Sequence, residues 1–210
     1  FKILDDAIGE ENIVYNQAGE AKSGFWIDMK LGTDFTVGPD ENNDKIEKHI
    51  ILINTYDGSS SLGVYLIASR LFCMNQLTGQ SQMFKVRHTQ NADKRIKAGT
   101  AMIRKATGYY QWFERKCNDL FNAPMKDEEM VEFTEELLPP TIKDEEPVVS
   151  TRKQNQRNEI IRLFHEGMGQ YVCQNTRWAA YNAVSEYTDH IRSVPVRNGR
   201  QEATVRFESI

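Results

Sequence analysis

The hydrophobic pattern of the chain changes once, near residue 90, and this change limits the folds open to it. Before that point apolar and polar side chains alternate, as in Gly24–Leu31, or form short apolar runs, as in Lys48–Thr55. Both patterns are typical of β-strands. After that point apolar residues recur every three or four positions, which is the helical period. Strands followed by helices predict the α+β fold class.

The first half is expected to form an antiparallel β-meander of about four to five strands. The apolar centre of Lys48–Thr55 predicts a central strand, and the turn residues of Asp57–Ser61 predict a hairpin between it and Leu62–Phe72. Met83–His88 is compatible with one further short strand. Gly32–Asp44 is rich in glycine, asparagine and aspartate, which predicts a loop.

The second half predicts a mainly helical region. An apolar stripe from Ala92 to Leu120 predicts one long helix, or two joined near Gly108, and further helices are expected at Asp127–Leu138, at Asn155–Phe164 and after a cap at Asn175 or Thr176. We expect a single domain over residues 1–210, excised from a longer chain. Its parts are 1–90 mainly β, 91–138 helical, 139–152 an acidic linker and 153–194 helical.

The sequence offers no catalytic constellation, so we expect no enzyme, no cofactor and no metal. His165-Glu166 is followed by Gly169, where a zinc protease needs its second histidine, and Gly58–Gly63 lacks the lysine of a phosphate-binding loop. The three cysteines are odd in number and far apart, which favours a reducing cytosol over a disulfide framework. No apolar run of about 18 residues is present, so no membrane span is expected.

The net charge of −4 hides two blocks of opposite charge. Ten basic residues against two acidic ones lie between Arg70 and Lys116, and ten acidic residues against two lysines lie between Asp119 and Pro147. A basic block in an acidic protein indicates a local site for a polyanion. The alternative is that the two blocks pair with each other as neighbouring helices.

The basic block combines cations with aromatic residues, as surfaces that bind single-stranded nucleic acid do. Tyr110 and Phe113 lie on the apolar stripe and are expected in the core, so Tyr109 or Trp112 is the better candidate for stacking on a base. No zinc finger, homeodomain or RNA-recognition signature is present, and sequence-specific reading has no support. The predicted DNA-binding residues are Arg70, Lys85, Arg87, His88, Lys94, Arg95, Lys97, Arg104, Lys105 and Tyr109.

Four sequence motifs occur in an order that resembles a known family. They are Asn54–Ser59 (NTYDGS), Arg70–Leu77 (RLFCMNQL), Val86–Thr89 (VRHT), and Trp178–Val184 (WAAYNAV) with the following Asp189-His190. Together they resemble the phage/plasmid-like proteins grouped as domain of unknown function 932. The resemblance covers most of the chain, from about Gly24 to His190.

Through this family the chain is similar, more remotely, to the single-strand annealing proteins, which include RecT and Erf and the ring-forming recombination mediators of eukaryotes. The resemblance implies nucleotide-independent annealing of complementary single-stranded DNA in phage or plasmid recombination, in the cytoplasm of a bacterial host. It implies a homo-oligomer, a ring or a filament, that works with a phage exonuclease or a single-strand binding protein.

Two other functions remain open. One is a non-enzymatic regulatory or interaction protein of a mobile element, which acts on a host protein through the acidic segment Asp127–Glu146. The other is an unrecognised enzyme centred on Arg87, His88, Asp189 and His190.

Overall fold

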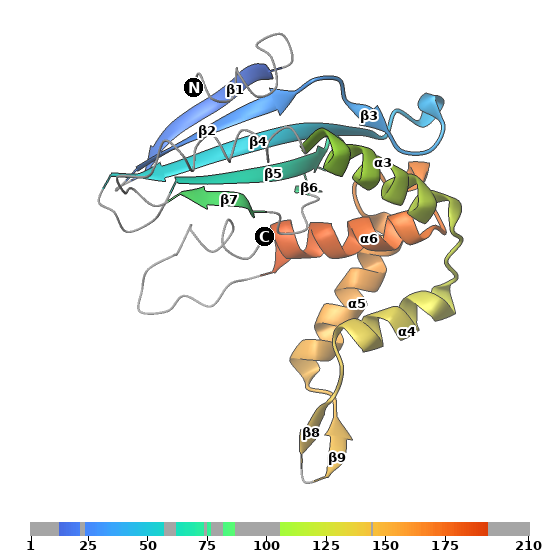
Figure 1. Cartoon of the computed structure of the whole chain (residues 1–210). Coiled ribbons are helices and arrows are strands. Elements are labelled where there is room, and N and C mark those ends of the chain that lie inside the picture. The colour runs from blue at the N-terminus through green and yellow to red at the C-terminus, as the bar shows by residue number, and fades with distance from the viewer. Residues whose placement is uncertain are drawn as a thin grey trace.

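The computed structural model of the chain describes residues 13–21, 24–56, 62–73, 75–76, 82–86, 106–143 and 145–192. An antiparallel sheet comes first and a group of helices follows, as the change of hydrophobic period predicts (Figure 1). The α+β prediction is therefore confirmed. The main strands are β1 (Ile13–Ala21), β2 (Gly24–Leu31), β4 (Lys45–Thr55) and β5 (Leu62–Arg70).

The strand β4 lies at the centre of the sheet, between β2 and β5, and pairs with both in antiparallel fashion. Its two neighbouring residues Ile50 and Ile51 point to opposite faces and both are buried, which confirms the central strand predicted from its apolar run. Three short strands extend the sheet. They are β3 (Phe35–Thr36), which pairs with β4, and β6 (Asn75–Gln76) and β7 (Gln82–Val86), which pair with β5.

The helices begin and end close to the predicted positions within the described residues. They are α3 (Ala106–Asn122), α4 (Asp127–Leu137), α5 (Thr151–Glu166) and α6 (Arg177–Glu186), with short helical turns η2 (Asp40–Asn42), η3 (Gln170–Val172) and η4 (Tyr187–Ile191). The predicted cap of the last helix is confirmed, because the hydroxyl of Thr176 accepts a hydrogen bond from the Ala179 N–H at 3.2 Å. The predicted helical stretch before Ala106 lies outside the described residues.

Some elements differ from the sequence predictions. The strand β3 and the helical turn η2 lie within Gly32–Asp44, which was predicted to be a loop. The strand β1 was not expected. It is an edge strand with a register shift near Tyr15, and its apolar residues Val14 and Tyr15 are both exposed, so its sequence does not alternate between apolar and polar side chains. The expected acidic linker instead contains a two-stranded hairpin, β8 (Thr141–Lys143) and β9 (Glu146–Val148), that projects from the helices (Figure 1).

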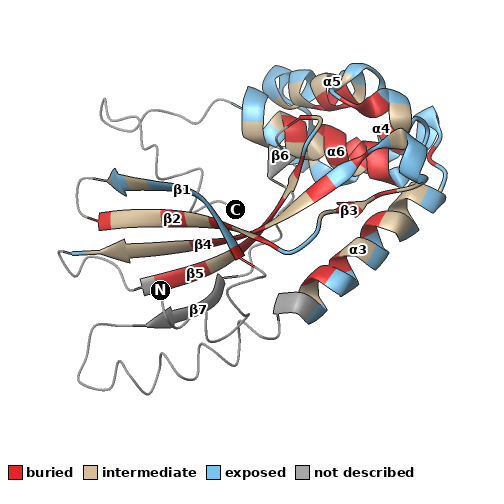
Figure 2. Cartoon of the chain, turned by 90° about the horizontal axis from the view of Figure 1, so that it is seen from above, coloured by how far each residue is buried: buried red, intermediate tan, exposed pale blue. Residues whose placement is uncertain are grey.

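The helices and the sheet share one hydrophobic core. Met29, Ile50 and Leu66 from the sheet lie in the same cluster of buried residues as Phe113 of α3 and Phe164 of α5. Figure 2 shows buried residues concentrated along α6, which lies between the sheet and the outer helices α4 and α5. A single core therefore fixes the orientation of every helix that carries a candidate functional residue.

Candidate nucleic-acid interface

The outer face of α3 presents an exposed aromatic ring together with two basic side chains. Trp112, Arg115 and Lys116 are all exposed, and their spacing of three and four residues places them on one side of the helix. The opposite side, which carries Phe113 and Cys117, is buried in the core. The outer face of α3 lines an open hollow of about 890 Å³.

Trp112 is better placed for stacking than Tyr109. The Trp112 side chain is 48% exposed, whereas Tyr109 is half-buried. The Tyr109 ring stacks on Phe113 at a centroid distance of 6.0 Å, and it also lies 5.5 Å from Tyr110 and 5.8 Å from Trp112. Tyr109 therefore packs against three neighbouring rings, one of which is Trp112. Of the two residues, Trp112 has the ring that is more accessible to a base.

The position of α3 on the sheet is fixed by a buried tyrosine. The Tyr110 hydroxyl lies 2.6 Å from the carbonyl oxygen of His49 on β4 and 2.9 Å from that of Ile67 on β5, and it donates its proton to this pair of acceptors. Burial raises the pKa of Tyr110, so the hydroxyl stays protonated and remains a donor. The prediction that Tyr110 and Phe113 belong to the core is confirmed.

The cations Arg115 and Lys116 of α3 form contacts within the chain that are weak enough for a ligand to replace them. Lys116 pairs with Asp119 at 3.1 Å, and both side chains are more than half exposed. An ion pair of this kind contributes about 0–1 kcal/mol, so a phosphate can displace Asp119 at little cost. The Arg115 Nε donates to the Gln111 carbonyl at 3.2 Å. Among the described residues its other guanidinium N–H groups have no partner, so they can bind a ligand.

Arg70 does not belong to this surface, and its prediction as a DNA-binding residue is wrong. Its side chain is fully buried, and its Nε and Nη2 donate to the two carboxylate oxygens of Asp44 at 2.7 and 2.8 Å. The same guanidinium donates to the carbonyl oxygens of Met168 at 3.3 Å and Gly169 at 3.0 Å. A guanidinium held by these acceptors, with no solvent access, cannot reach a phosphate.

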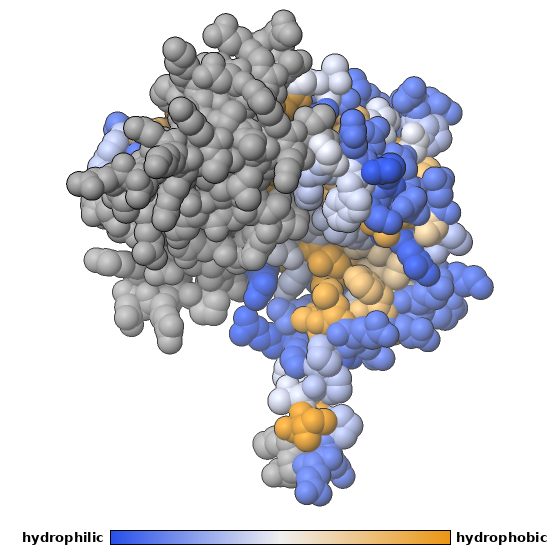
Figure 3. All heavy atoms as spheres, viewed as in Figure 1, coloured by the Kyte–Doolittle hydropathy of each residue, from blue (hydrophilic) through white to orange (hydrophobic). Residues whose placement is uncertain are grey.

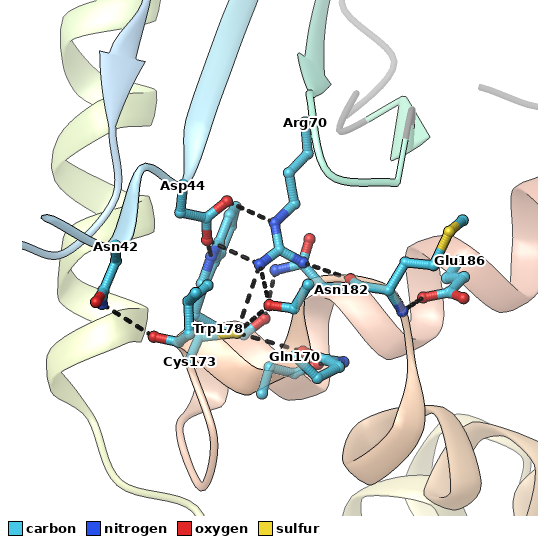
Figure 4. Close-up of polar contacts among 12 residues, drawn as sticks. Asn42, Asp44, Arg70, Gln170, Cys173, Trp178, Asn182 and Glu186 are labelled. Atoms are coloured by element: carbon cyan, nitrogen blue, oxygen red, sulfur yellow. Dashed lines mark hydrogen bonds and ion pairs between the residues drawn. The ribbon is translucent and has the colours of Figure 1, made fainter. Parts of the chain in front are cut away.

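The Asp44–Arg70 pair joins the sheet to the helices, as Figure 4 shows. Asp44 precedes β4, Arg70 ends β5, and the Trp178 Nε1 of α6 donates to Asp44 at 2.9 Å. Gly169, whose carbonyl accepts from Arg70, has a φ of 72°, and a Cβ there would lie 2.7 Å from the Cβ of Phe72. Glycine is therefore required at this turn for both its backbone angle and its small size.

Two of the buried cysteines, Cys117 and Cys173, lie in surroundings that suppress nucleophilic chemistry. Burial raises the pKa of Cys173 to about 11 and also raises that of Cys117, so both thiols are protonated at neutral pH. His190, which the enzyme hypothesis includes, has its Nε2 3.0 Å from the carbonyl oxygen of Cys73. Among the described residues, no group of three histidine, cysteine or acidic side chains could hold a metal ion.

A cluster of charged residues lies on the opposite face of the sheet from Met29 and Ile50. The His49 Nδ1 lies 2.9 Å from Asp28 and its Nε2 lies 3.3 Å from Glu47. Burial alone would lower the pKa of His49, but the hydrogen bonds and negative charges of Asp28 and Glu47 together outweigh it and raise that pKa. Because each charge in the cluster has a partner, we interpret the cluster as structural.

Most of the predicted DNA-binding cations lie outside the described residues. They are Arg87, His88, Lys94, Arg95, Lys97, Arg104 and Lys105. Lys85 lies on β7, where the backbone pairs it with Gly63 of β5. None of the described helices is long and apolar enough to cross a membrane.

A comparison with family models identifies the family of the chain. The model of domain of unknown function 932, abbreviated DUF932, matches residues 1–210. The chain belongs to the DUF932 family. No curated protein and no solved structure matches the sequence.

Two of the DUF932 motifs quoted from the sequence meet in the buried network. Arg70 comes from the second motif and Trp178 from the last, and both donate to Asp44, which is in neither. The contact between His190 and the Cys73 carbonyl joins the same two motifs a second time. These parts of the DUF932 motifs therefore hold the helices against the sheet, a role that we did not predict from the sequence.

Proposed function

We propose that this DUF932 chain binds single-stranded DNA and anneals complementary strands, with the outer face of α3 as part of the binding surface. The observation that carries the proposal is the exposed Trp112 beside Arg115 and Lys116. The sequence just before α3 supports it, because five predicted cations lie there within twelve residues: Lys94, Arg95, Lys97, Arg104 and Lys105.

The proposed mechanism is electrostatic and geometric. The cations neutralise phosphates along one strand, and Trp112 stacks on a base, so the base edges remain free to pair with a second strand. Counterion release supplies most of the binding free energy, so affinity falls steeply with salt. No nucleotide or metal enters this scheme. We further propose a homo-oligomer in the bacterial cytoplasm that works with a phage exonuclease or a single-strand binding protein.

Binding is tested by fluorescence polarisation of a labelled oligo-dT and of a matched duplex, each titrated against salt. The proposal predicts binding at micromolar concentrations or tighter, a preference for the single strand and a clear salt slope. Stacking on an aromatic residue contributes about 1–3 kcal/mol per base, so W112A is expected to weaken binding roughly 5- to 150-fold. R115A with K116A should lower the salt slope by about 1 to 2.

Tyr171 of η3 supplies the matched control, because it is an aromatic side chain with 70% exposure that lies outside the α3 face. Y171A should leave oligo-dT binding unchanged. Failure of the chain to bind oligo-dT at low salt would refute the proposal, and equal losses in W112A and Y171A would refute the role of α3. Annealing itself is then followed with two complementary strands that carry a fluorophore and a quencher.

A further inference from the structure

A second surface lies between α4 and α6, away from the exposed face of α3. A groove of about 430 Å³ has an apolar floor that includes Leu120, Phe133, Ala180 and Tyr181. Figure 3 shows apolar residues gathered on the surface between these two helices, with hydrophilic residues along the border. The groove volume falls within the range of pockets that hold small ligands.

One wall of the groove is acidic. Glu129, Glu132 and Glu136 line it from α4, and their spacing of three and four residues places them along one face. Within the described part of the chain neither Glu132 nor Glu136 forms an ion pair, whereas the neighbouring Glu135 pairs with Arg157 at 3.1 Å. Arg177 is the basic residue among the described lining.

The stability of α4 does not explain the acidic wall. Acidic residues in the first turn stabilise a helix through its dipole, and the Glu129 carboxylate also accepts from the Lys126 N–H at 2.8 Å. Glu132 and Glu136 lie beyond that turn, Glu136 lies next to the C-terminal residue of α4, and like charges four residues apart destabilise a helix. These two carboxylates are therefore costly for the isolated chain and favourable beside a cation.

We infer that the groove between α4 and α6 binds a basic amphipathic helix of a partner protein. Apolar side chains on one face of that helix would pack on Phe133 and Tyr181, and flanking lysine or arginine residues would pair with Glu132 and Glu136. The eleven residues of α4 span about 16 Å, which matches about three turns of a bound helix with apolar anchors three or four residues apart.

The charge of the groove argues for a partner protein rather than the hairpin of a second copy. That hairpin projects from the body and exposes Ile142 (Figure 1), but it also carries Glu145 and Glu146, which the acidic wall would repel. The inference goes beyond the proposed DNA function and does not depend on it.

The test uses synthetic helical peptides and the full chain, without nucleic acid. The first peptide has leucine along one face and lysine on the flanks, and a second has the same composition with the leucines dispersed around the helix. Titration with a fluorescent label is expected to give micromolar binding of the first peptide and at least tenfold weaker binding of the second. E132Q with E136Q should weaken the first peptide at least tenfold.

The matched control is E145Q with E146Q, which removes the same number of charges from the hairpin and should leave peptide binding unchanged. Circular dichroism checks that both double variants are folded. Equal binding of the two peptides, equal losses in the two double variants, or no binding would each overturn the inference. Self-association of the chain that E132Q with E136Q abolishes would also overturn it, since a second copy would then occupy the groove.

Discussion

Replacement of Arg70 by methionine tests whether the buried ion pair holds the helices to the sheet. The substitution keeps a long unbranched side chain but removes both donors to Asp44. Among the described residues, the Trp178 N–H is then the remaining side-chain donor to the buried Asp44 carboxylate. It also removes the donors to the Met168 and Gly169 carbonyls.

The expected loss is large for a single substitution. Removal of one partner of a buried ion pair costs about 3–5 kcal/mol, because the other charge is left without compensation. Each buried carbonyl that loses its donor adds about 1–3 kcal/mol where no other donor replaces it. We therefore expect R70M to lower the free energy of unfolding by at least about 3 kcal/mol, a large part of the about 5–15 kcal/mol that a typical domain has.

The assay is urea unfolding followed by circular dichroism, with D44L, R70M and the double variant compared in one cycle. A buried ion pair predicts that the double variant is more stable than either single variant, since it leaves neither charge unpaired. W178F removes one hydrogen bond to Asp44 together with part of a fully buried side chain, and it is the second variant to measure if R70M does not fold. A loss below about 1 kcal/mol for R70M, or strictly additive losses in the cycle, would refute this reasoning.

Three further substitutions test other contacts by the same unfolding assay. H49Q should destabilise the fold most below pH 6.5. The pKa of His49 is raised in the folded protein, so its stabilising effect is complete below the pKa of the unfolded chain and is lost as the pH rises through the pKa of the folded protein. A loss of stability that does not change with pH would contradict the pairing of His49 with Asp28. Y110F should cost about 1–3 kcal/mol, since two buried carbonyls lose their donor, and an unchanged midpoint would show that α3 is held by packing alone. T176A should cost about 1 kcal/mol through the lost N-cap of α6, which T176S should restore.

The elements that were predicted correctly are those whose signal is local. Alternation identifies β2, the apolar run identifies the central β4, and a hydroxyl three residues before the Ala179 N–H identifies the start of α6. The edge strand β1 and the hairpin β8–β9 are short of such signals, because most of their side chains face solvent and no apolar period forms.

The burial of Arg70 was not predictable in the same way. Its partner Asp44 lies 26 residues away in a loop rich in polar turn residues, and Trp178 lies 134 residues from Asp44. From the sequence alone, a basic residue in a block of other basic residues is predicted to lie on the surface. The motif around Arg70 indicated the family of the chain and gave no sign that the role of Arg70 is structural.

The two proposed surfaces share the helix α3, and this arrangement follows from the contacts that hold α3 on the sheet. Tyr110 fixes its first turns to β4 and β5, and Asn118 accepts from the Gly38 N–H at 2.9 Å further along. Leu120 then reaches the groove between α4 and α6, eight residues or about 12 Å from Trp112. A helix held at both ends can present Trp112, Arg115 and Lys116 to a nucleic acid while its last turn forms part of an acidic groove. The opposite charges along the sequence can therefore serve two separate ligands on one rigid support.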